Sequence, residues 1–369
     1  MTTPSRKVYD LADERIHLTG TGRMPQDRPL APADLATLDA WLTSGAPAGS
    51  ACGPTGVDAS GVDASTPDAP IASREAGPDE QCFELRAHGQ QAAGDKTPFS
   101  SSLPEGYTCF NFSVPWTKPM QGVEFQSIVD NTAVVHHWLL YQSAIPTFDG
   151  SFASCLGTHP GGTLVTGWAP GGRDLVLPPD IGLELPAPGQ SFQLEIHYNN
   201  PSAQMFQDQT GVRICATPTF RTHTASITFA GTEAIQIPAR AQATATGKCT
   251  PKRTGLGPTD PIHVLYDWPH GHKLLTRMQT LINRANGTME TLHDAPFTFS
   301  NQTNYDTPAL LLPGDTLTTT CWYNNTTSGN VTFGPSTTQE MCYAFIYAWP
   351  AHALDSGGAL VGAANTCLQ

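Results

Sequence analysis

The residues of this chain best suited to chemistry are two groups of histidines and one methionine. His136 and His137 are adjacent in the apolar run "AVVHHWLLYQ", and His197 lies in "SFQLEIHYNN". Burying two neighbouring imidazoles in an apolar strand is costly unless both are satisfied. Because neighbouring residues of a regular strand face opposite sides, a metal shared by this pair requires a bulge or a strand end.

The second group is the motif "WPHGH", in which His270 and His272 are separated by one glycine. This spacing places both rings on one face of a strand, as strand-borne metal ligands require. Met341, in "QEMCYAFIYAW", is a candidate third ligand, although most strand methionines only fill the core. A thioether stabilises Cu(I), whereas zinc sites rarely use methionine, so the combined set favours copper. Two sites of unequal softness fit redox chemistry better than hydrolysis.

The other seven histidines are interpreted as ordinary polar surface residues: His17, His88, His159, His223, His263, His293 and His352.

The elements that must position these ligands are short strands. From Cys82 onward the sequence has short alternating runs, such as "ASITFAG" and "TLTTTCWYNNT", between clusters of Gly, Pro, Asn and Asp. The pattern predicts an all-β fold of two consecutive antiparallel, jelly-roll-like β-sandwiches. We place the N-terminal sandwich at residues 81–216 and the C-terminal sandwich at residues 217–369.

The chain before the strands has a different composition. In residues 1–47, Leu35, Leu38, Trp41 and Leu42 follow a helical spacing, which predicts a short helical segment. Residues 48–80 are rich in Gly, Ala, Ser, Asp and Pro and contain the repeat "GVDASGVDAS". Such a stretch cannot bury enough apolar surface to fold, so it is predicted to be a flexible, disordered linker.

Composition excludes several classes of function. The formal net charge of −13 argues against a nucleic-acid partner, which would need a basic face. No apolar run is long enough for a membrane span, and no signal peptide is present in this chain. None of the nine cysteines forms CxxC, which argues against a zinc ribbon. Dispersed cysteines in a β-rich chain indicate disulfides and an exported protein, in the periplasm, on the cell surface or secreted.

The order of these motifs resembles the copper type II, ascorbate-dependent monooxygenases, the family of peptidylglycine α-hydroxylating and dopamine β-monooxygenases. The resemblance covers residues 82–367 and rests on "DNTAVVHHWLLYQ", "FQLEIHYNNP", "HGHKLLTRM" and "TTQEMCYAF". It implies two copper ions in each chain. His136, His137 and His197 would bind the electron-transfer copper. His270, His272 and Met341 would bind the catalytic copper, across an interdomain cleft from the first.

The resemblance also implies which cysteines pair. The counterparts of the family's disulfides are Cys82–Cys215, Cys109–Cys155, Cys249–Cys367 and Cys321–Cys342. The spacing alone leaves every pairing of these eight cysteines open. Cys52, in the linker, is expected to be free or paired outside this chain.

The implied activity is hydroxylation of a substrate C–H bond with O2 and a one-electron donor such as ascorbate. Where the peptide-hydroxylating branch binds a terminal carboxylate, this chain has Trp268, Tyr343 and Phe345. Aromatic faces in place of a guanidinium favour an apolar or aromatic small molecule, or an amine held by cation–π attraction. We therefore predict that these three residues line the substrate pocket.

The N-terminal segment "GRMPQDRPLAPADLATLDAWLTSGAP" resembles the C-terminal end of a c-type cytochrome domain, with Met24 at the axial position. The haem-attaching CxxCH is absent, so Met24 has no haem to ligate in this chain. A c-type cytochrome is therefore a candidate electron donor. The alternatives are a copper-binding or adhesive pair of β-sandwiches without turnover, and a zinc hydrolase, against which Met341 argues.

Overall fold

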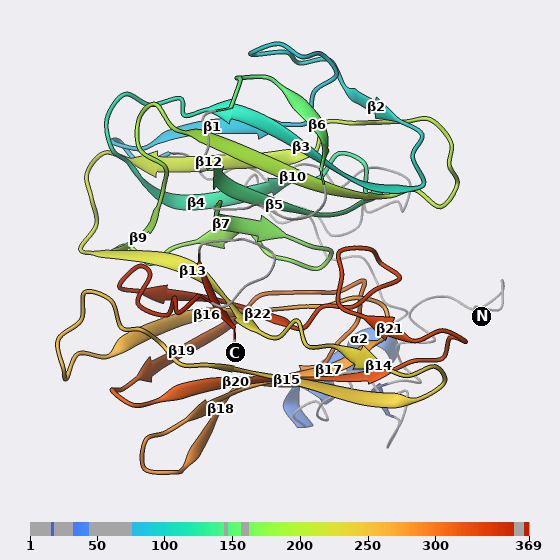
Figure 1. Ribbon diagram of the computed structural model, residues 1–369, viewed down its shortest axis with the longest axis vertical. Helices are drawn as coiled ribbons and strands as arrows, with labels where there is room; N and C mark the ends of the chain where they lie inside the picture. Colours follow the sequence, from blue (N-terminus) through green and yellow to red (C-terminus); the bar gives the residue numbers. More distant parts are fainter. Residues whose placement is uncertain are drawn as a thin grey trace. The chain divides into compact units, whose positions relative to one another are not determined.

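The computed structural model describes residues 16–17, 32–43, 76–143, 147–155, 162–357 and 365–368 (Figure 1). The chain divides into two compact units, Met1–Ser73 and Arg74–Gln369, and each is described by itself. In the first unit, the helix expected within residues 1–47 is present as α2 (Pro32–Thr43). Met24, Cys52 and the predicted linker up to residue 75 lie outside the described residues.

The second unit is built from strands, which confirms the all-β prediction. Its largest sheet has ten strands in the order β1-β12-β4-β9-β13-β22-β16-β19, with β8 paired to β4 and β23 paired to β13. The strands are β1 (Gln81–Arg86), β12 (Gly211–Thr217), β4 (Gln121–Ile128), β9 (Ile181–Glu184), β13 (His223–Gly231), β22 (Tyr343–Trp349), β16 (Ile262–His270), β19 (Tyr305–Leu311), β8 (Leu175–Val176) and β23 (Thr366–Leu368).

Two further sheets cover the large one to form the two sandwiches. The five-stranded sheet belongs to the first half of the unit and contains β6 (Phe152–Cys155), β3 (Glu105–Ser113), β10 (Ser191–Asn199), β5 (Val135–Ser143) and β7 (Thr163–Trp168). The four-stranded sheet belongs to the second half and contains β15 (Gln242–Cys249), β20 (Thr316–Asn324), β17 (Leu275–Asn283) and β18 (Met289–Pro296). Two short pairs complete the fold: β2 (Phe99–Ser101) with β11 (Phe206–Asp208), and β14 (Gln236–Ile237) with β21 (Val331–Thr332).

The two sandwiches share one sheet, which the sequence pattern did not predict. β9 of the first half pairs in parallel with β13 of the second, with His223 opposite Ile181. Figure 1 shows this junction, where β9 of the first half lies beside the yellow β13 of the second half. The predicted boundary at residue 216 lies near the end of β12, whereas the ladder of hydrogen bonds continues past it.

The hydrophobic core also runs through both halves. One cluster of buried side chains contains Trp138 and Leu139 of β5 together with Trp268 of β16 and Phe345 of β22. The close approach depends on Gly167 of β7, where a Cβ atom would lie 2.9 Å from the Trp268 ring and 2.5 Å from Leu139. Any larger residue at this position would push the two halves apart.

Four disulfides fasten the unit, and they are the pairs implied by the family resemblance: Cys82–Cys215, Cys109–Cys155, Cys249–Cys367 and Cys321–Cys342. The first joins β1 to β12, where the two cysteines are direct partners in the antiparallel register. The third ties β15 of the four-stranded sheet to β23 of the ten-stranded sheet.

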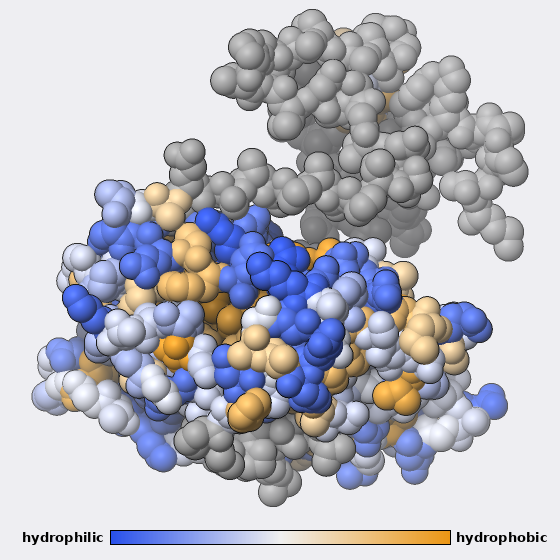
Figure 2. All heavy atoms as spheres, turned by 90° about the horizontal axis from the view of Figure 1, so that it is seen from above, coloured by the Kyte–Doolittle hydropathy of each residue, from blue (hydrophilic) through white to orange (hydrophobic). Residues whose placement is uncertain are grey.

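The surface of the described part is mostly polar. Figure 2 shows a face on which hydrophilic side chains predominate and apolar ones form smaller patches among them. Among the described residues, no helix has the length and apolar character needed to cross a membrane.

Candidate metal centres

The first histidine cluster lies on two neighbouring strands of the five-stranded sheet. His137 of β5 is the register partner of His197 of β10, and the next pair is Val135 with Tyr198. His136 is therefore the extra residue of a β-bulge, which turns both members of the pair toward His197. The ring centroids of the three histidines are 5.0–5.3 Å apart, and one nitrogen from each lies within 4.8 Å of the others.

The hydrogen bonds of this cluster leave the Nδ1 atom of His197 free to bind a metal. His197 Nε2 donates to Glu105 Oε1 at 3.2 Å, because an ionised carboxylate can only accept. His197 Nδ1 therefore keeps its lone pair, and it is buried without a hydrogen-bond partner among the described residues. The Nδ1 atoms of His136 and His137 are 3.0 Å apart. The three histidines thus offer one ring nitrogen each within 4.8 Å of one another.

Burial disfavours the charged form of His136 and His137 in the first cluster. The side chains of His136, His137 and His197 are 6 %, 2 % and 0 % exposed. Loss of hydration, followed by repulsion from the neighbouring imidazoles, lowers the pKa of His136 to about 2 and holds that of His137 well below its usual range. Neutral imidazoles are the form that ligates metals.

The second cluster comes from the end of β16 and the turn that follows. The rings of His270 and His272 are 5.7 Å apart. His270 Nδ1 donates to Gln302 Oε1 at 2.8 Å, and His272 Nδ1 donates to the backbone oxygen of Gln339 at 3.0 Å. Both Nε2 atoms therefore carry a lone pair, and that of His272 is buried without a partner in the described part of the chain. Burial lowers the pKa of His270 to about 3 and that of His272 to about 4.

Met341 is held against this second cluster through its backbone. The carboxylate of Glu340 accepts from the backbone N–H groups of His272, at 3.0 Å, and Leu274, at 2.6 Å. A Cβ atom at Gly271 would lie 3.0 Å from the Met341 carbonyl oxygen, so the glycine of "HGH" allows the two segments to meet. The buried Met341 side chain belongs to the core cluster that runs through both halves.

The two clusters are neighbours in this structure, whereas the sequence led us to expect a cleft between them. The rings of His137 and His270 are 5.3 Å apart and nearly perpendicular. Phe299 stacks on His136 at 4.0 Å, and its ring lies 6.2 Å from that of His272. The shared sheet and the continuous core bring the two clusters together. Neither feature can be predicted from the spacing of the ligands in the sequence.

The three residues predicted to line a substrate pocket are fully buried. Trp268 packs against Phe345 at 4.8 Å and donates from Nε1 to the Gln302 backbone oxygen. The Phe345 ring lies 5.5 Å from that of His270, and Tyr343 donates to Glu233. In this arrangement they support the His270 side of the second cluster, so a role in lining a pocket would require this packing to open.

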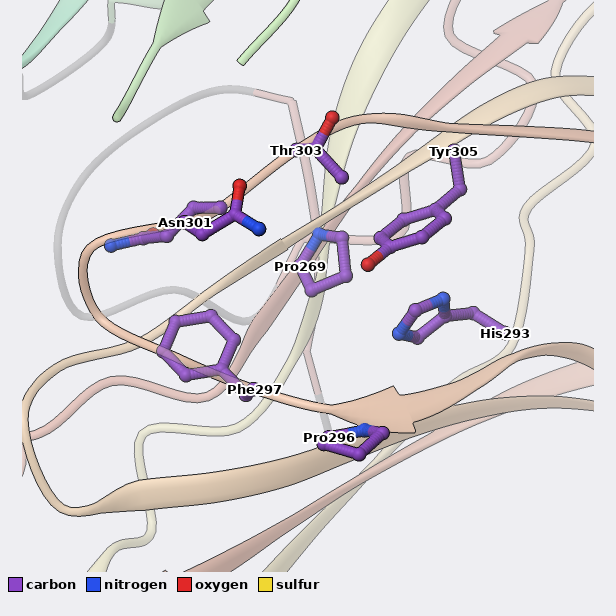
Figure 3. Close-up of a pocket in the computed structure, with 8 residues that line it drawn as sticks. Pro269, His293, Pro296, Phe297, Asn301, Thr303 and Tyr305 are labelled. Carbon is purple, nitrogen blue, oxygen red and sulfur yellow. The ribbon is translucent and has the colours of Figure 1, made fainter. Parts of the chain in front are cut away.

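A small cavity of about 10 Å³, room for one water molecule, lies beside the second cluster. Figure 3 shows the side chains that line it. The eight lining residues are Pro269, His293, Pro296, Phe297, Asn301, Gln302, Thr303 and Tyr305.

Two histidines interpreted as surface residues are buried instead. His293 stands beside this cavity, and burial lowers its pKa to about 4. His88 packs edge-on against Phe110, Phe112 and Phe152. An isolated histidine in a strand, as His293 is, or just after one, as His88 is, gives no sequence pattern that distinguishes a buried site from an exposed one.

Sequence reasoning missed the residues that orient the ligands. Glu105, Gln302 and Gln339 each accept a hydrogen bond from a candidate ligand. They are 92, 32 and 67 residues away from their partners in the chain, so no local spacing connects them. The hydrogen bond from His197 is the main cause that lowers the pKa of Glu105 to about 2.

Comparison with known proteins identifies the same two halves. The N-terminal domain of the copper type II ascorbate-dependent monooxygenases matches residues 97–205, and the C-terminal domain of that family matches residues 221–358. The first match contains His136, His137 and His197, and the second contains His270, His272 and Met341.

Individual relatives agree with this assignment. DBH-like monooxygenase protein 1 of Gallus gallus is 28% identical over 278 residues, which covers 66% of this chain and 44% of that protein. Dopamine beta-hydroxylase of Bos taurus is 28% identical over 307 residues, covering 75% of this chain and 48% of that protein. The chain thus spans about half the length of the curated relatives it matches.

Proposed function

Because the chain belongs to the copper type II ascorbate-dependent monooxygenase family, we propose that it hydroxylates a C–H bond of a small molecule with two copper ions. The observation that carries this proposal is the pair of adjacent clusters of buried histidines. The proposed ligands are His136, His137 and His197 for one ion and His270, His272 and Met341 for the other.

The residues fit copper on their own chemistry. Buried nitrogens without partners occur in both clusters, at His197 Nδ1 and His272 Nε2. Three imidazoles suit either oxidation state of copper, and two imidazoles with a thioether favour Cu(I). When bound, copper supplies the one-electron redox steps and the activation of O2. The protein orients the rings through hydrogen bonds, and Phe299 and the surrounding core would exclude water.

The overall reaction requires electrons and protons in addition to O2 and the substrate. One atom of O2 enters the substrate C–H bond as a hydroxyl group, and the other leaves as water, which consumes two electrons and two protons. We propose ascorbate as the donor of these electrons, one at a time. A c-type cytochrome is the second candidate donor, suggested by the segment around Met24. Export is the matching location, since the four disulfides require an oxidising compartment.

For the substrate, we propose a small aromatic compound or amine. Three of the relatives are named dopamine beta-hydroxylase. The Trp268 side chain cannot pair with a carboxylate, so a peptide with a free C-terminus would bury its charge without a partner. The alternative of a copper-binding protein without turnover predicts no substrate-dependent use of O2.

The test is product analysis with isotopically labelled O2. The copper-loaded full chain, supplied with ascorbate and a panel of phenylalkylamines and glycine-extended peptides, should transfer one labelled oxygen atom to an amine or aromatic product. The His272→Ala variant should form no such product, whereas His263→Ala, away from both clusters, should behave as wild type. Labelled water or peroxide as the sole product for every substrate would contradict the proposal, and preference for the peptides would contradict the substrate class.

A further inference from the structure

Glu105 touches both halves of the unit at the point where the two metal centres meet. It is the first residue of β3, and its carboxylate accepts from three donors. His197 Nε2 and the backbone N–H of Thr337 donate to Oε1, at 3.2 Å and 2.7 Å, and Ser336 Oγ donates to Oε2 at 3.2 Å. His197 belongs to the first cluster, whereas Ser336 and Thr337 belong to the second half. A single carboxylate therefore joins the two.

The second-half partners lie in a short stretch between β21 and β22, residues 335–340, which we call the bridging segment. Its first residue, Pro335, accepts a hydrogen bond at 2.6 Å from Tyr107, whose ring stacks on His197 at 4.2 Å. At its other end, the Gln339 carbonyl accepts from His272. The next residue after the segment is Met341. The bridging segment thus contacts first-cluster neighbours at one end and second-cluster ligands at the other.

The Glu105 carboxylate can only accept hydrogen bonds, so it determines which nitrogen of His197 carries the proton. Because it has only acceptor sites, Glu105 requires the proton of His197 to be on Nε2, which leaves Nδ1 toward the metal. The same oxygen accepts from Thr337, so a movement of the bridging segment would alter the hydrogen bond to His197. An aliphatic residue at position 105 would provide neither contact.

We propose that Glu105 is a positioning residue that orients His197 and docks the bridging segment, so that the two metal centres are held in one fixed arrangement. The inference rests on the proposed function only for the identity of the metal. The docking contact itself exists in the protein chain and can be measured without copper.

The test compares Glu105→Ala, Glu105→Gln and Ser336→Ala with the control Glu84→Ala, which removes an exposed carboxylate that pairs with Arg86 on β1. In the full chain stripped of copper, hydrogen exchange at the Thr337 amide should accelerate at least about tenfold in Glu105→Ala. Glu105→Gln should restore much of the protection, because its amide oxygen still accepts. Ser336→Ala removes only the Oε2 partner and should give a smaller acceleration. Glu84→Ala should leave this amide unchanged.

The second measurement uses the copper-loaded protein and follows copper affinity and the Cu(II) spectrum. Glu105→Ala should weaken copper binding at the first centre by about 10–100-fold and change its Cu(II) electron paramagnetic resonance spectrum, whereas Glu84→Ala should do neither. Unaltered exchange at Thr337 in both Glu105→Ala and Glu105→Gln would overturn the docking role, and an unaltered spectrum and affinity would overturn the orienting role. If wild type bound no copper while Thr337 still responded to Glu105, the proposed function would fail and the docking role would stand.

Discussion

A hydrogen bond to one ring nitrogen decides which nitrogen of a histidine can bind a metal, and three of the candidate ligands have such a bond. His197, His270 and His272 each have an oxygen partner on one side of the ring. Burial adds to this at His270 and His272 by lowering their pKa to about 3 and about 4. These two rings therefore keep a lone pair for a metal cation at neutral pH.

Replacement of Met341 by alanine tests the thioether. The variant should retain copper at His136, His137 and His197 but bind Cu(I) weakly at the second centre, and its turnover should fall by at least about tenfold. Copper content after dialysis and the rate of product formation are the measurements. Met289→Ala, which removes an exposed methionine on β18, is the matched control and should change neither. Wild-type turnover in Met341→Ala would remove Met341 from the site.

Because Asp267 of β16 is buried, we expect the free energy of unfolding to depend on pH. It is fully buried, and burial, partly offset by the side chain of Thr280, raises its pKa to about 7. The folded state then holds the proton more tightly than the unfolded state, so stability should decrease as the pH rises from about 4 to about 7.

The Asp267→Asn variant lacks this titration. It should be more stable than wild type by about 1–4 kcal/mol above about pH 7 and nearly equal to it below about pH 4. Urea unfolding across that range is the measurement. A constant difference between the two proteins at all pH values would show that Asp267 does not titrate in this window.

For single residues, the sequence indicated the candidate metal ligands but not the residues that accept hydrogen bonds from them. The spacing of His270 and His272 and the run around His136 and His137 were visible as local patterns. Glu105 and Gln302 were not, because they reach the ligands only after distant strands have paired. The burial of Trp268, Tyr343 and Phe345 was also missed, since an aromatic residue in a strand fits a core as well as a pocket.

Among the elements, β5 shows how one irregularity builds a site. A regular strand would turn His136 and His137 to opposite faces, and the bulge opposite His197 brings both to the same side. The alternation of residues predicted the strands themselves. It could not predict the pairing of β9 with β13, because a parallel ladder between two halves depends on the tertiary arrangement.

Phe299, in the loop after β18, is expected to shield the first centre from water and chelators. Phe299 covers His136 with its ring, and Lys273 lies 5.6 Å above the centre of that ring. The Phe299→Ala variant should let water and chelators reach His136, so copper should leave the first centre several-fold faster. Stopped-flow transfer of Cu(I) to a coloured chelator measures this rate. Phe148→Ala, which removes an exposed phenylalanine, should release copper at the wild-type rate.

If Phe299→Ala and Phe148→Ala released copper equally fast, Phe299 would have no part in the shielding. Both variants replace a phenylalanine by alanine, but only Phe299→Ala removes a ring that stacks on His136. The comparison therefore isolates the effect of that contact.

For the whole molecule, the disulfides and the shared sheet determine how the halves are held. Eight of the nine cysteines are paired, and Cys52 lies outside the described residues. Thiol titration of the denatured, unreduced protein should therefore find about one free thiol. Loss of a disulfide typically costs about 2–5 kcal/mol, so reduction should unfold the protein at temperatures where the oxidised form is stable. Eight or nine free thiols in the protein as purified would contradict this account.

The division into two sandwiches followed from the sequence, whereas their closeness did not. Composition and alternation require two layers of strands in each half, but they contain no information on the contact between His137 and His270. That contact is produced by residues such as Gly167 and Trp268, which meet across the halves. The site is thus a property of the whole unit.

The most direct test of the central claim is copper X-ray absorption of the ascorbate-reduced protein loaded with two copper ions. The ligand sets proposed here predict imidazole nitrogens at both ions and one sulfur scatterer for every two coppers. The sulfur signal should disappear in Met341→Ala and persist in His197→Ala, whose remaining copper should show the sulfur more strongly. A spectrum without sulfur in wild type, or one whose sulfur survives in Met341→Ala, would contradict the assignment of the second centre.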